Sequence, residues 1–319
     1  MVYRTCLENK SAARHRGFES HPLRQMSKLE LMENKGKATI YVLACVVLWA
    51  FIPVVSRLGQ QNLDNYQFLF WSSFLSFMVL AISSLVAGKK ESFKAYSPRS
   101  LVTAFGLGFL GTFLYYLLLY FGYAKAKGLE VLVIQYTWPI FIVIFSVWLL
   151  NEKLTWKSIL SCTLGFLGVL IVLTKGDFSQ LYLADISVDL IVLLAAGVFG
   201  LFSVLSKKVD FEPFTATTLF FLSATAFSFF SMMIFSNFQF PSSSSIIPIL
   251  GNGILINGFS YILWLKGLSH AKASSTAPLV FITPILAAIL IVIFFKEAFL
   301  PVYLIGLALV VVAGLISRK

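Results

Sequence analysis

The stretch YLLLYFGYAKAKGLEVLVIQYTWPIFIVIFSVWLLNE, residues 116–152, aligns without a gap to YILWLKGLSHAKASSTAPLVFITPILAAILIVIFFKE, residues 261–297. Apolar segments match one another by chance, so the shared Leu and Ile residues carry little weight. The informative identities, all at an offset of 145 residues, are Tyr116/Tyr261, Gly122/Gly267, Ala126/Ala271, Lys127/Lys272, Pro139/Pro284 and Glu152/Glu297. Self-similarity of this kind indicates that one structural unit occurs twice in the chain.

The composition of the chain places this repeat in a lipid bilayer. Of the 319 residues 58% are hydrophobic and 12% are charged, and the mean hydropathy is +0.86. A soluble globule of this size needs more charged residues to cover its surface. A spanning helix needs about 20 apolar residues to cross roughly 30 Å of hydrocarbon. Ten windows meet this requirement, near residues 38–58, 67–87, 101–123, 131–150, 157–174, 188–206, 214–235, 245–265, 277–295 and 300–317.

These long apolar runs favour helices over a β-barrel. Lipid requires the backbone polar groups to be satisfied within the segment, and the runs show no alternation of polarity. We therefore predict an all-α integral membrane protein with ten transmembrane helices. Each repeat, residues 26–174 and 175–319, holds five of them, and because five is odd the second repeat enters the membrane from the opposite side. Two inverted repeats are a recurring basis for alternating access, with the substrate site near the middle of the membrane.

Basic residues are distributed unevenly over the predicted loops. By the positive-inside rule the richer side is cytoplasmic, so we predict that both termini lie in the cytoplasm. Because this charge is spread over many loops, it does not indicate a nucleic-acid-binding surface. Counted from Met26, one side holds fifteen Lys and Arg residues, which are Lys28, Lys35, Lys37, Lys89, Lys90, Lys94, Arg99, Lys153, Lys157, Lys207, Lys208, Lys266, Lys272, Arg318 and Lys319. The other side holds five, which are Arg57, Lys125, Lys127, Lys175 and Lys296.

Residues 1–25 differ in character from everything that follows. They are polar and contain Arg4, Arg14, Arg16 and Arg24. Our hypothesis is that they are upstream sequence read through a misassigned start, and that the protein begins at Met26 or Met32. The alternative interpretation is an Arg-rich, acid-poor organellar transit peptide.

Several short motifs occur in a characteristic order along residues 38–317. They are LWAFIP in the first predicted helix, the prolines of TWPIF and TPILA in the fourth and ninth, and a Glu just after each of those two helices, in NEKL and KEAF. Together they resemble the EamA-type branch of the drug/metabolite transporter superfamily. The resemblance implies a ten-helix carrier of small molecules in the cytoplasmic (inner) membrane of a bacterium. Within the superfamily, QYTWP is similar to a segment of bacterial aromatic amino-acid exporters.

Ionisable residues are missing from the interior of the predicted helices, where they would mark a functional site by default. Every Asp and Glu lies in a tail, in a loop or at a helix end, so recognition is expected to rely on neutral groups. For Glu152 and Glu297 we favour loop salt bridges with Lys153 or Lys296 over a role in gating.

Polar and aromatic residues interrupt several apolar helices and are the candidate substrate-binding residues. Such stripes suit an apolar pocket with a few fixed hydrogen-bonding groups. We expect Pro53, Pro139 and Pro284 to break their helices beside this pocket. The competing interpretation is packing or the interfacial aromatic belt, to which we assign Trp71, Trp148 and Trp156. The candidates are Gln135, Tyr136 and Trp138 in the fourth helix, Asn257, Tyr261 and Trp264 in the eighth, Trp49 in the first and Tyr116 in the third.

Enzymatic chemistry is not indicated by the residue inventory. The sequence has no carboxylate pair, His cluster, Ser/His/Asp set or Gly-rich phosphate loop in a suitable context. The three cysteines, Cys6, Cys45 and Cys162, have neither disulfide nor metal-ligand spacing. We therefore predict no enzyme activity, no cofactor and no metal.

The function predicted from these features is export of amino acids or similar small metabolites by alternating access, and the narrower resemblance favours aromatic amino acids. One alternative is a nucleotide-sugar or sugar-phosphate exchanger of the same superfamily, for which only Lys266 and Lys272 are placed to bind phosphate. A second alternative is a membrane scaffold or receptor that transports nothing. Facilitated diffusion is the simplest form of coupling, and proton-driven exchange is the alternative. The sequence does not assign an oligomeric state.

Overall fold

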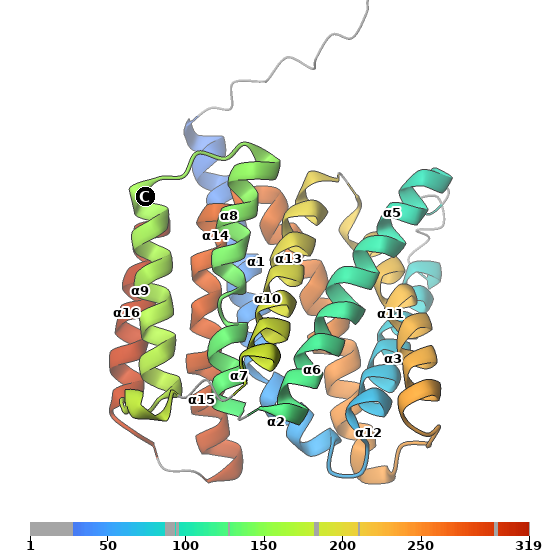
Figure 1. Cartoon of the computed structure of the whole chain (residues 1–319). Helices are drawn as coiled ribbons and strands as arrows, with labels where there is room; N and C mark the ends of the chain where they lie inside the picture. Colours follow the sequence, from blue (N-terminus) through green and yellow to red (C-terminus); the bar gives the residue numbers. More distant parts are fainter. Residues whose placement is uncertain are drawn as a thin grey trace, which may run out of the picture.

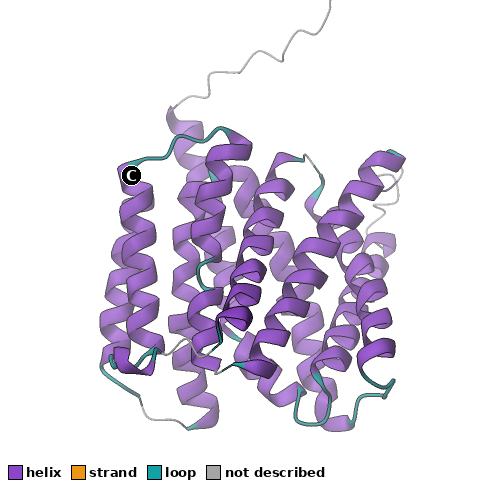
Figure 2. Cartoon of the chain, in the orientation of Figure 1, coloured by secondary structure: helices purple, strands orange, loops and turns teal. Residues whose placement is uncertain are grey.

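The structure is a computed structural model that describes residues 28–86, 93, 96–126, 128–181, 185–209, 211–296 and 299–318. Every regular element in these ranges is a helix (Figures 1 and 2). The hypothesis on residues 1–25 therefore concerns a segment outside the described residues.

The first repeat contributes five membrane spans. Two of them are interrupted, the first at Phe51 and the fourth at Tyr136 and Thr137, and a third contains a π-helical stretch. In chain order the elements are α1 (Lys28–Ala50) with α2 (Ile52–Gly59), α3 (Asn65–Val86), α5 (Pro98–Gly108) with η2 (Phe109–Leu114) and α6 (Tyr115–Lys125), α7 (Gly128–Gln135) with α8 (Trp138–Leu150), and α9 (Trp156–Leu173).

The second repeat follows after the short helix η3 (Phe178–Gln180) and has the same plan. Its third span contains a π-helical stretch and its fourth contains a 3-10 segment, at positions that match the irregular stretches of the third and fourth spans of the first repeat. The elements are α10 (Ile186–Lys208), α11 (Pro213–Phe235), α12 (Ser243–Leu250) with η4 (Gly251–Phe259) and α13 (Ser260–His270), α14 (Ala273–Thr276) with η5 (Ala277–Phe281) and α15 (Ile282–Phe295), and α16 (Val302–Arg318).

These elements confirm the predicted membrane fold. Within the described residues, nine helices are long and apolar enough to span a bilayer, and the tenth span is the shorter apolar helix Val302–Ser317. Large apolar side chains such as Trp148, Trp156 and Ile247 have at least 72% of their area exposed, as suits contact with lipid. The chain is an all-α integral membrane protein of two inverted five-helix repeats.

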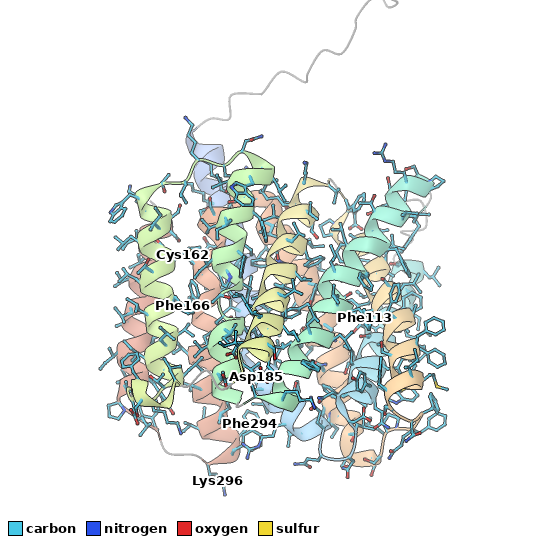
Figure 3. All side chains as sticks on the ribbon, viewed as in Figure 1. Phe113, Cys162, Phe166, Asp185, Phe294 and Lys296 are labelled. Carbon is cyan, nitrogen blue, oxygen red and sulfur yellow. The ribbon has the colours of Figure 1, made fainter. Side chains whose placement is uncertain are left out.

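Within the described residues, α1 begins and α16 ends at the same end of the bundle (Figure 1). We call this the termini end and the other the opposite end, where Figure 3 labels Phe294 and Lys296. Because each repeat has an odd number of spans, α1 begins at the termini end and α10, the corresponding first span of the second repeat, begins at the opposite end.

Close helix contacts hold the outer parts of the two repeats together. The helix α9 packs along α16, and a Cβ added to Gly168 would lie 2.8 Å from the carbonyl oxygen of Gly306. On the other flank α5 packs on α11, and a Cβ added to Gly108 would lie 2.6 Å from Cα of Phe220. Small residues at these crossings let the backbones approach, as is usual in membrane bundles.

Three helix breaks lie near the centre of the bundle, each just before a proline. The chain turns at Phe51 before Pro53, at Tyr136 and Thr137 before Pro139, and through η5 before Pro284. A proline has no amide hydrogen and its ring clashes with the carbonyl four residues earlier, so a continuous helix is disfavoured at each place. The sequence prediction that these prolines break their helices is consistent with this geometry.

Candidate functional site

A cavity of about 430 Å³ lies between the two repeats. It extends from the centre of the bundle towards the opposite end, because its wall includes Gln60 and Asn65 from the connection between α2 and α3. Its other lining residues come from α1, α2, α6, α7, α9 and α15, and they are Trp49, Ile52, Pro53, Ser56, Arg57, Tyr115, Tyr116, Leu119, Leu132, Gln135, Tyr136, Leu173, Pro284, Ala287, Ala288 and Ile291.

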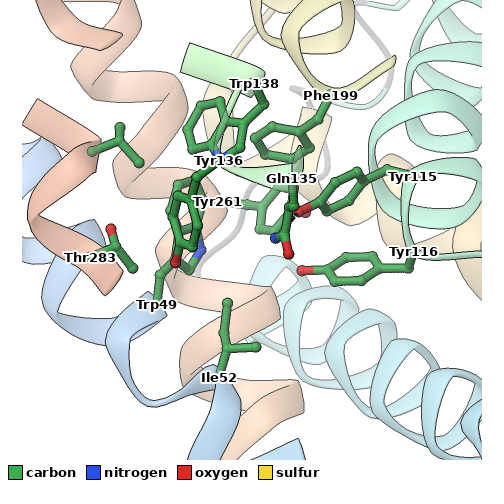
Figure 4. A pocket seen from close by; sticks show the side chains of 11 residues that line it. Trp49, Ile52, Tyr115, Tyr116, Gln135, Tyr136, Trp138, Phe199, Tyr261 and Thr283 are labelled. Atoms are coloured by element: carbon green, nitrogen blue, oxygen red, sulfur yellow. Dashed lines mark hydrogen bonds between the residues drawn. The ribbon is translucent and has the colours of Figure 1, made fainter. Parts of the chain in front are cut away.

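The cavity continues inward as a small pocket of about 40 Å³ (Figure 4). The two spaces share six residues, and the inner pocket adds Trp138, Phe199, Tyr261, Val280 and Thr283. These additional residues come from α8, α10, α13, η5 and α15, so both repeats form the inner wall.

Aromatic rings form the inner wall of this pocket. The ring of Trp49 lies 6.0 Å from those of Trp138 and Phe199 and 6.1 Å from that of Tyr261, all measured between centroids and all in edge-to-face geometry. Such edge-to-face contacts stabilise an aromatic cluster beyond the burial of its surface. The wall is consequently well packed on the side facing the termini end.

Fixed hydrogen bonds orient the polar groups around the cavity. Trp49 Nε1 donates to Ser260 Oγ at 2.7 Å, and Gln135 Nε2 donates to Tyr115 Oη at 2.7 Å. The hydroxyl of Tyr261 donates to the carbonyl of Gly111 at 3.3 Å. The bond to Tyr115 fixes the side-chain amide of Gln135 at the cavity wall.

Thr283 is the polar residue of the inner pocket that the protein leaves unsatisfied. Its side chain is buried, and its hydroxyl has no hydrogen-bond partner among the described residues. Burying a hydroxyl without a partner costs about 1 to 3 kcal/mol. An unsatisfied hydroxyl beside a cavity is a natural place for a polar group of a ligand.

The helix breaks meet at the same pocket. Pro53, Pro139 and Pro284 cannot donate a hydrogen bond to the carbonyls of Trp49, Gln135 and Val280, which lie four residues earlier. All three of these earlier residues line the inner pocket. The arrangement resembles the interrupted helices at the centre of carriers built from inverted repeats.

Most candidate residues from the sequence lie together at this cavity. Gln135, Tyr136, Trp138, Trp49, Tyr116 and Tyr261 line the cavity or its inner pocket, as do Pro53 and Pro284.

The other candidates, Trp264, Asn257 and Pro139, are buried and are not among the described lining residues. Trp264 packs behind Trp49 at 5.5 Å between ring centroids and donates a hydrogen bond to Ser203 at 3.2 Å.

Several lining residues were missed by the sequence reasoning. Tyr115 was overlooked; it lies beside Tyr116 at the start of α6, directly after the π-helical stretch η2, and both residues line the cavity. Arg57 was counted with the loops, yet it belongs to the last turn of α2. Nothing in the sequence distinguishes Phe199 and Thr283 from residues that only pack between helices.

Two buried carboxylates lie at the opposite end, although no such group was expected. Glu130 is in the first turn of α7 and Asp189 is in the first turn of α10, and both side chains are buried. A carboxylate in the first turn of a helix is favoured by the unpaired amides there. Neither residue is among the described lining of the cavity.

At the termini end, Glu152 joins the two repeats. Its carboxylate accepts hydrogen bonds from the amides of Ala273 and Ser274 at 2.9 and 3.0 Å and from the Ser274 hydroxyl at 2.5 Å. Asn151, in left-handed conformation with φ of 53°, ends α8 and turns the chain so that Glu152 reaches the start of α14. The predicted pairing of Glu152 with Lys153 is therefore replaced by the capping of α14, while Glu297 lies outside the described residues.

Lys207 strengthens the same region. Its ammonium group donates hydrogen bonds to the carbonyls of Leu268 and Ala271, where α13 ends and the chain passes to α14. Carbonyls at the end of a helix attract a cation. The end of α13 and the start of α14 are thus held by a lysine and a glutamate, and this end of the bundle is tied across the repeats.

The fold and the cavity are those of a membrane carrier with two inverted repeats, and comparisons with known proteins agree. The model of the EamA-like transporter family matches residues 36–174 and again residues 186–318, one match in each repeat. The chain therefore belongs to the EamA-like transporter family.

Curated relatives are transporters of varied description. The chain is 25% identical over 264 residues to "Uncharacterized transporter YoaV" of Bacillus subtilis, covering 79% of this chain and 86% of that protein. It is 24% identical over 265 residues to the "S-adenosylmethionine uptake transporter" of Rickettsia prowazekii, covering 81% and 84%. It is 24% identical over 269 residues to "Aromatic amino acid exporter YddG" of Ancylobacter novellus, covering 82% and 89%.

A solved crystal structure has the same fold. It superimposes with a TM-score of 0.78 at 19% sequence identity, over 89% of this chain and 97% of that one. At this identity the likeness concerns the fold alone. Together with the family match it makes the chain a multi-pass membrane transporter.

Proposed function

We propose that this transporter exports aromatic amino acids across the cytoplasmic membrane of a bacterium by alternating access. The observation that carries the proposal is the cavity between the repeats, whose inner wall is aromatic and whose surroundings include three interrupted helices. An apolar pocket with a few convergent polar groups is the usual form of a small-molecule site.

The groups of the inner pocket suit an aromatic side chain with or without a polar substituent. Trp49 and Tyr116 offer faces and edges to a ring, and Gln135 and Thr283 offer hydrogen bonds to a hydroxyl or an indole nitrogen. The curated aromatic amino-acid exporter among the relatives supports this class of substrate.

The orientation of the carrier follows from its charges. The predicted loops at the termini end hold the larger share of Lys and Arg, so we place this end in the cytoplasm. The cavity then extends towards the outside while Glu152 and Lys207 hold the cytoplasmic end together. In the export cycle this is the state that releases substrate, and opening of the Glu152 contacts would admit substrate from the cytoplasm.

Exchange of nucleotide sugars or sugar phosphates receives less support. Its expected phosphate ligands were Lys266 and Lys272, and neither is among the described lining residues. Lys266 instead lies over the ring of Tyr41, with 5.6 Å between Nζ and the ring centroid.

Counterflow with purified protein in liposomes tests the proposal. Vesicles preloaded with unlabelled phenylalanine should accumulate labelled phenylalanine, tyrosine and tryptophan, and should take up leucine, a nucleoside, a sugar phosphate and S-adenosylmethionine much more slowly. Accumulation only of one of the latter compounds would reassign the substrate. Absence of flux with every compound would leave the scaffold or receptor interpretation in its place.

A further inference from the structure

A second cavity, of about 330 Å³, lies between α3 and α11 and shares no described lining residue with the substrate cavity. Figure 1 shows these two helices side by side on one flank of the bundle. No charged residue is among the described residues of the wall. On α3 the wall includes Phe77, Ala81, Ser84 and Leu85, which recur at helical spacing, and on α11 it includes Leu219 and Leu222.

This cavity suits a hydrocarbon chain rather than water. Water occupies a cavity only where several polar groups hold it, whereas apolar cavities stay dry. Leu85 lines the cavity and is 58% exposed, and its neighbours Ile82 and Val86 are 53% and 84% exposed at the same end of α3. Because α3 spans the membrane, the medium at this exposed edge is lipid, and an acyl chain can enter the cavity from the side.

Ser84 adds a polar group at the entrance to the cavity. It lies in the last turn of α3, is 2% exposed, and its hydroxyl has no hydrogen-bond partner among the described residues. The other hydroxyl of the described wall is satisfied, because Thr218 donates to the carbonyl of Phe214 at 2.9 Å. The end of a spanning helix lies near the boundary between hydrocarbon and headgroups, which is where a glycerolipid has its ester carbonyls. Such a carbonyl is an acceptor of the kind that Ser84 lacks.

The cavity belongs to the conformation that the structure describes. The helices α3 and α11 are the second spans of the two repeats. At the opposite end α3 is tied to the connection that follows α11, because Gln67 Nε2 donates to the carbonyl of Asn237 at 2.8 Å and Trp71 Nε1 donates to that of Gln239 at 2.9 Å. Towards the termini end the two helices separate around the cavity. Alternating access exchanges the roles of the two repeats, which would reverse these two ends and close the cavity.

We propose that one acyl chain of a phospholipid binds between α3 and α11 and stabilises the state in which the substrate cavity extends to the outside. The lipid comes from the leaflet at the termini end, which is the cytoplasmic leaflet in the proposed orientation. A ligand that binds only one of two states shifts the equilibrium towards that state. The inference rests on the proposed alternating access, and it adds a regulatory lipid site that is separate from the substrate site.

Photolabelling of delipidated protein in detergent tests the binding of the chain. The probe is a phosphatidylethanolamine with a diazirine in the middle of one acyl chain, and the labelled peptides are located by mass spectrometry. Labelling near Phe77 and Leu222 should saturate as the probe is added, whereas labelling near the exposed Ile247 should rise in proportion to the probe. Unlabelled phosphatidylethanolamine should suppress the saturable labelling, and its headgroup without acyl chains should not.

Three variants separate chain binding from folding. Ala81→Phe places a ring in the cavity and should reduce the saturable labelling roughly tenfold, the effect of losing the burial of about two methylene groups. Ser83→Phe adds the same ring at an exposed neighbouring position outside the described lining, and should leave the labelling unchanged. Ser84→Ala should weaken binding of the probe roughly threefold to fivefold through loss of one hydrogen bond. All variants are compared at matched monodispersity.

A cysteine at Ser56, which lines the substrate cavity, reports the state of the carrier. In a background without the native cysteines, its reactivity in delipidated protein should rise when phosphatidylethanolamine is added. The Ala81→Phe protein, whose cavity is filled by its own ring, should react at the higher rate without lipid. This gain also shows that the variant is folded.

The outcomes distinguish this site from the proposed function. Labelling near Phe77 that never saturates, or that is equal in Ala81→Phe and the parent protein, overturns the lipid site whether or not phenylalanine is transported. Saturable labelling with a Ser56 reactivity that lipid does not change overturns the effect on the state of the carrier. Absence of phenylalanine counterflow alongside saturable labelling and lipid-dependent Ser56 reactivity overturns the proposed substrate and leaves the lipid site standing.

Discussion

The two ends of this molecule differ in how the repeats meet. At the termini end Glu152 of the first repeat caps α14 of the second, and Lys207 holds the adjoining helix end. At the opposite end the repeats separate around a cavity whose wall reaches the connection between α2 and α3. Since the two repeats share one plan, this difference between the ends is one of conformation, and under the alternating access proposed above it corresponds to one of the two states of the carrier.

The largest effect expected from this comparison is an all-or-none difference in the side of the membrane from which the two ends can be labelled. In a background that lacks the native cysteines, a cysteine at Ser243, exposed at the opposite end, should react with an impermeant thiol reagent added outside intact cells. A cysteine at Lys153, exposed at the termini end, should react only after the membrane is made permeable. Labelling of both positions from the same side of the membrane would contradict the inverted arrangement of the repeats. A reversed pattern would contradict the proposed orientation of the exporter.

The next prediction concerns the contacts of Glu152. Glu152→Gln keeps the shape but removes the charge, and it replaces one of the two accepting oxygens with an amide nitrogen that cannot accept a hydrogen bond from a backbone amide. Charge-assisted bonds are worth about 1.5 to 3 kcal/mol against about 1 kcal/mol for neutral ones. The closed termini end should lose a few kcal/mol, which shifts the balance between states at least tenfold. A cysteine at Ser56, which lines the cavity, should then react more slowly from outside, because that end is closed more of the time.

The matched control for Glu152 is its neighbour. Lys153→Gln alters the charge of the same loop by one unit but touches none of the three hydrogen bonds. Its Ser56 labelling rate should equal that of the parent protein. Equal rates for both variants would mean that Glu152 does not hold this end closed.

The helical architecture on which this comparison depends was predicted from the sequence. Every predicted span is present, and the breaks fall at the predicted prolines because loss of a backbone donor is a local property that Pro53, Pro139 and Pro284 carry with them. The repeat was visible because residues such as Gly122 and Gly267 are constrained by close packing in both copies. A Cβ on either one would lie within 2.6 Å of a valine methyl group of a neighbouring helix.

The features that could not be predicted from the sequence depend on helical register and on contacts between residues far apart in the chain. The π-helical stretches η2 and η4 add residues to a turn, so a face counted at 3.6 residues per turn is wrong beyond them. Asn257 lies within η4 and is not among the described lining residues, whereas Tyr261, which follows η4, lines the inner pocket. The partners of Glu152 lie 121 and 122 positions away, whereas Lys153 is adjacent and was therefore preferred.

A smaller effect should distinguish the aromatic wall of the cavity from the lipid-facing surface. Trp138→Ala removes a ring that lines the inner pocket, and aromatic contacts are worth about 0.5 to 1.5 kcal/mol beyond burial. The apparent affinity for phenylalanine in counterflow should fall roughly threefold to tenfold. Trp156→Ala, at a position 72% exposed, should leave it unchanged. A similar loss in both variants, at matched folded yield, would show that tryptophan acts here through general stability.

The smallest expected effect concerns the unsatisfied hydroxyl of Thr283. Thr283→Val removes a buried hydroxyl that has no hydrogen-bond partner among the described residues, so thermal stability in detergent should hold or rise. If a polar group of the substrate binds this hydroxyl, the same change should weaken apparent affinity in counterflow by roughly threefold to fivefold, since one net hydrogen bond contributes about 1 kcal/mol.

Two further variants separate the effect of losing the Thr283 hydroxyl from two other effects. These are the change at the methyl group of Thr283 and the general effect of removing a buried polar atom. Thr283→Ser keeps the hydroxyl and should keep the affinity. Ser223→Ala removes another buried hydroxyl without a described partner, on α11 and away from the lining residues, and should raise stability in the same way with no change in affinity. Since only Thr283 lines the pocket, a stability gain in both variants combined with an affinity loss in one alone would assign the hydroxyl to the substrate. Unchanged affinity in Thr283→Val would instead mean that the inner pocket receives the ring of the substrate by apolar contact only.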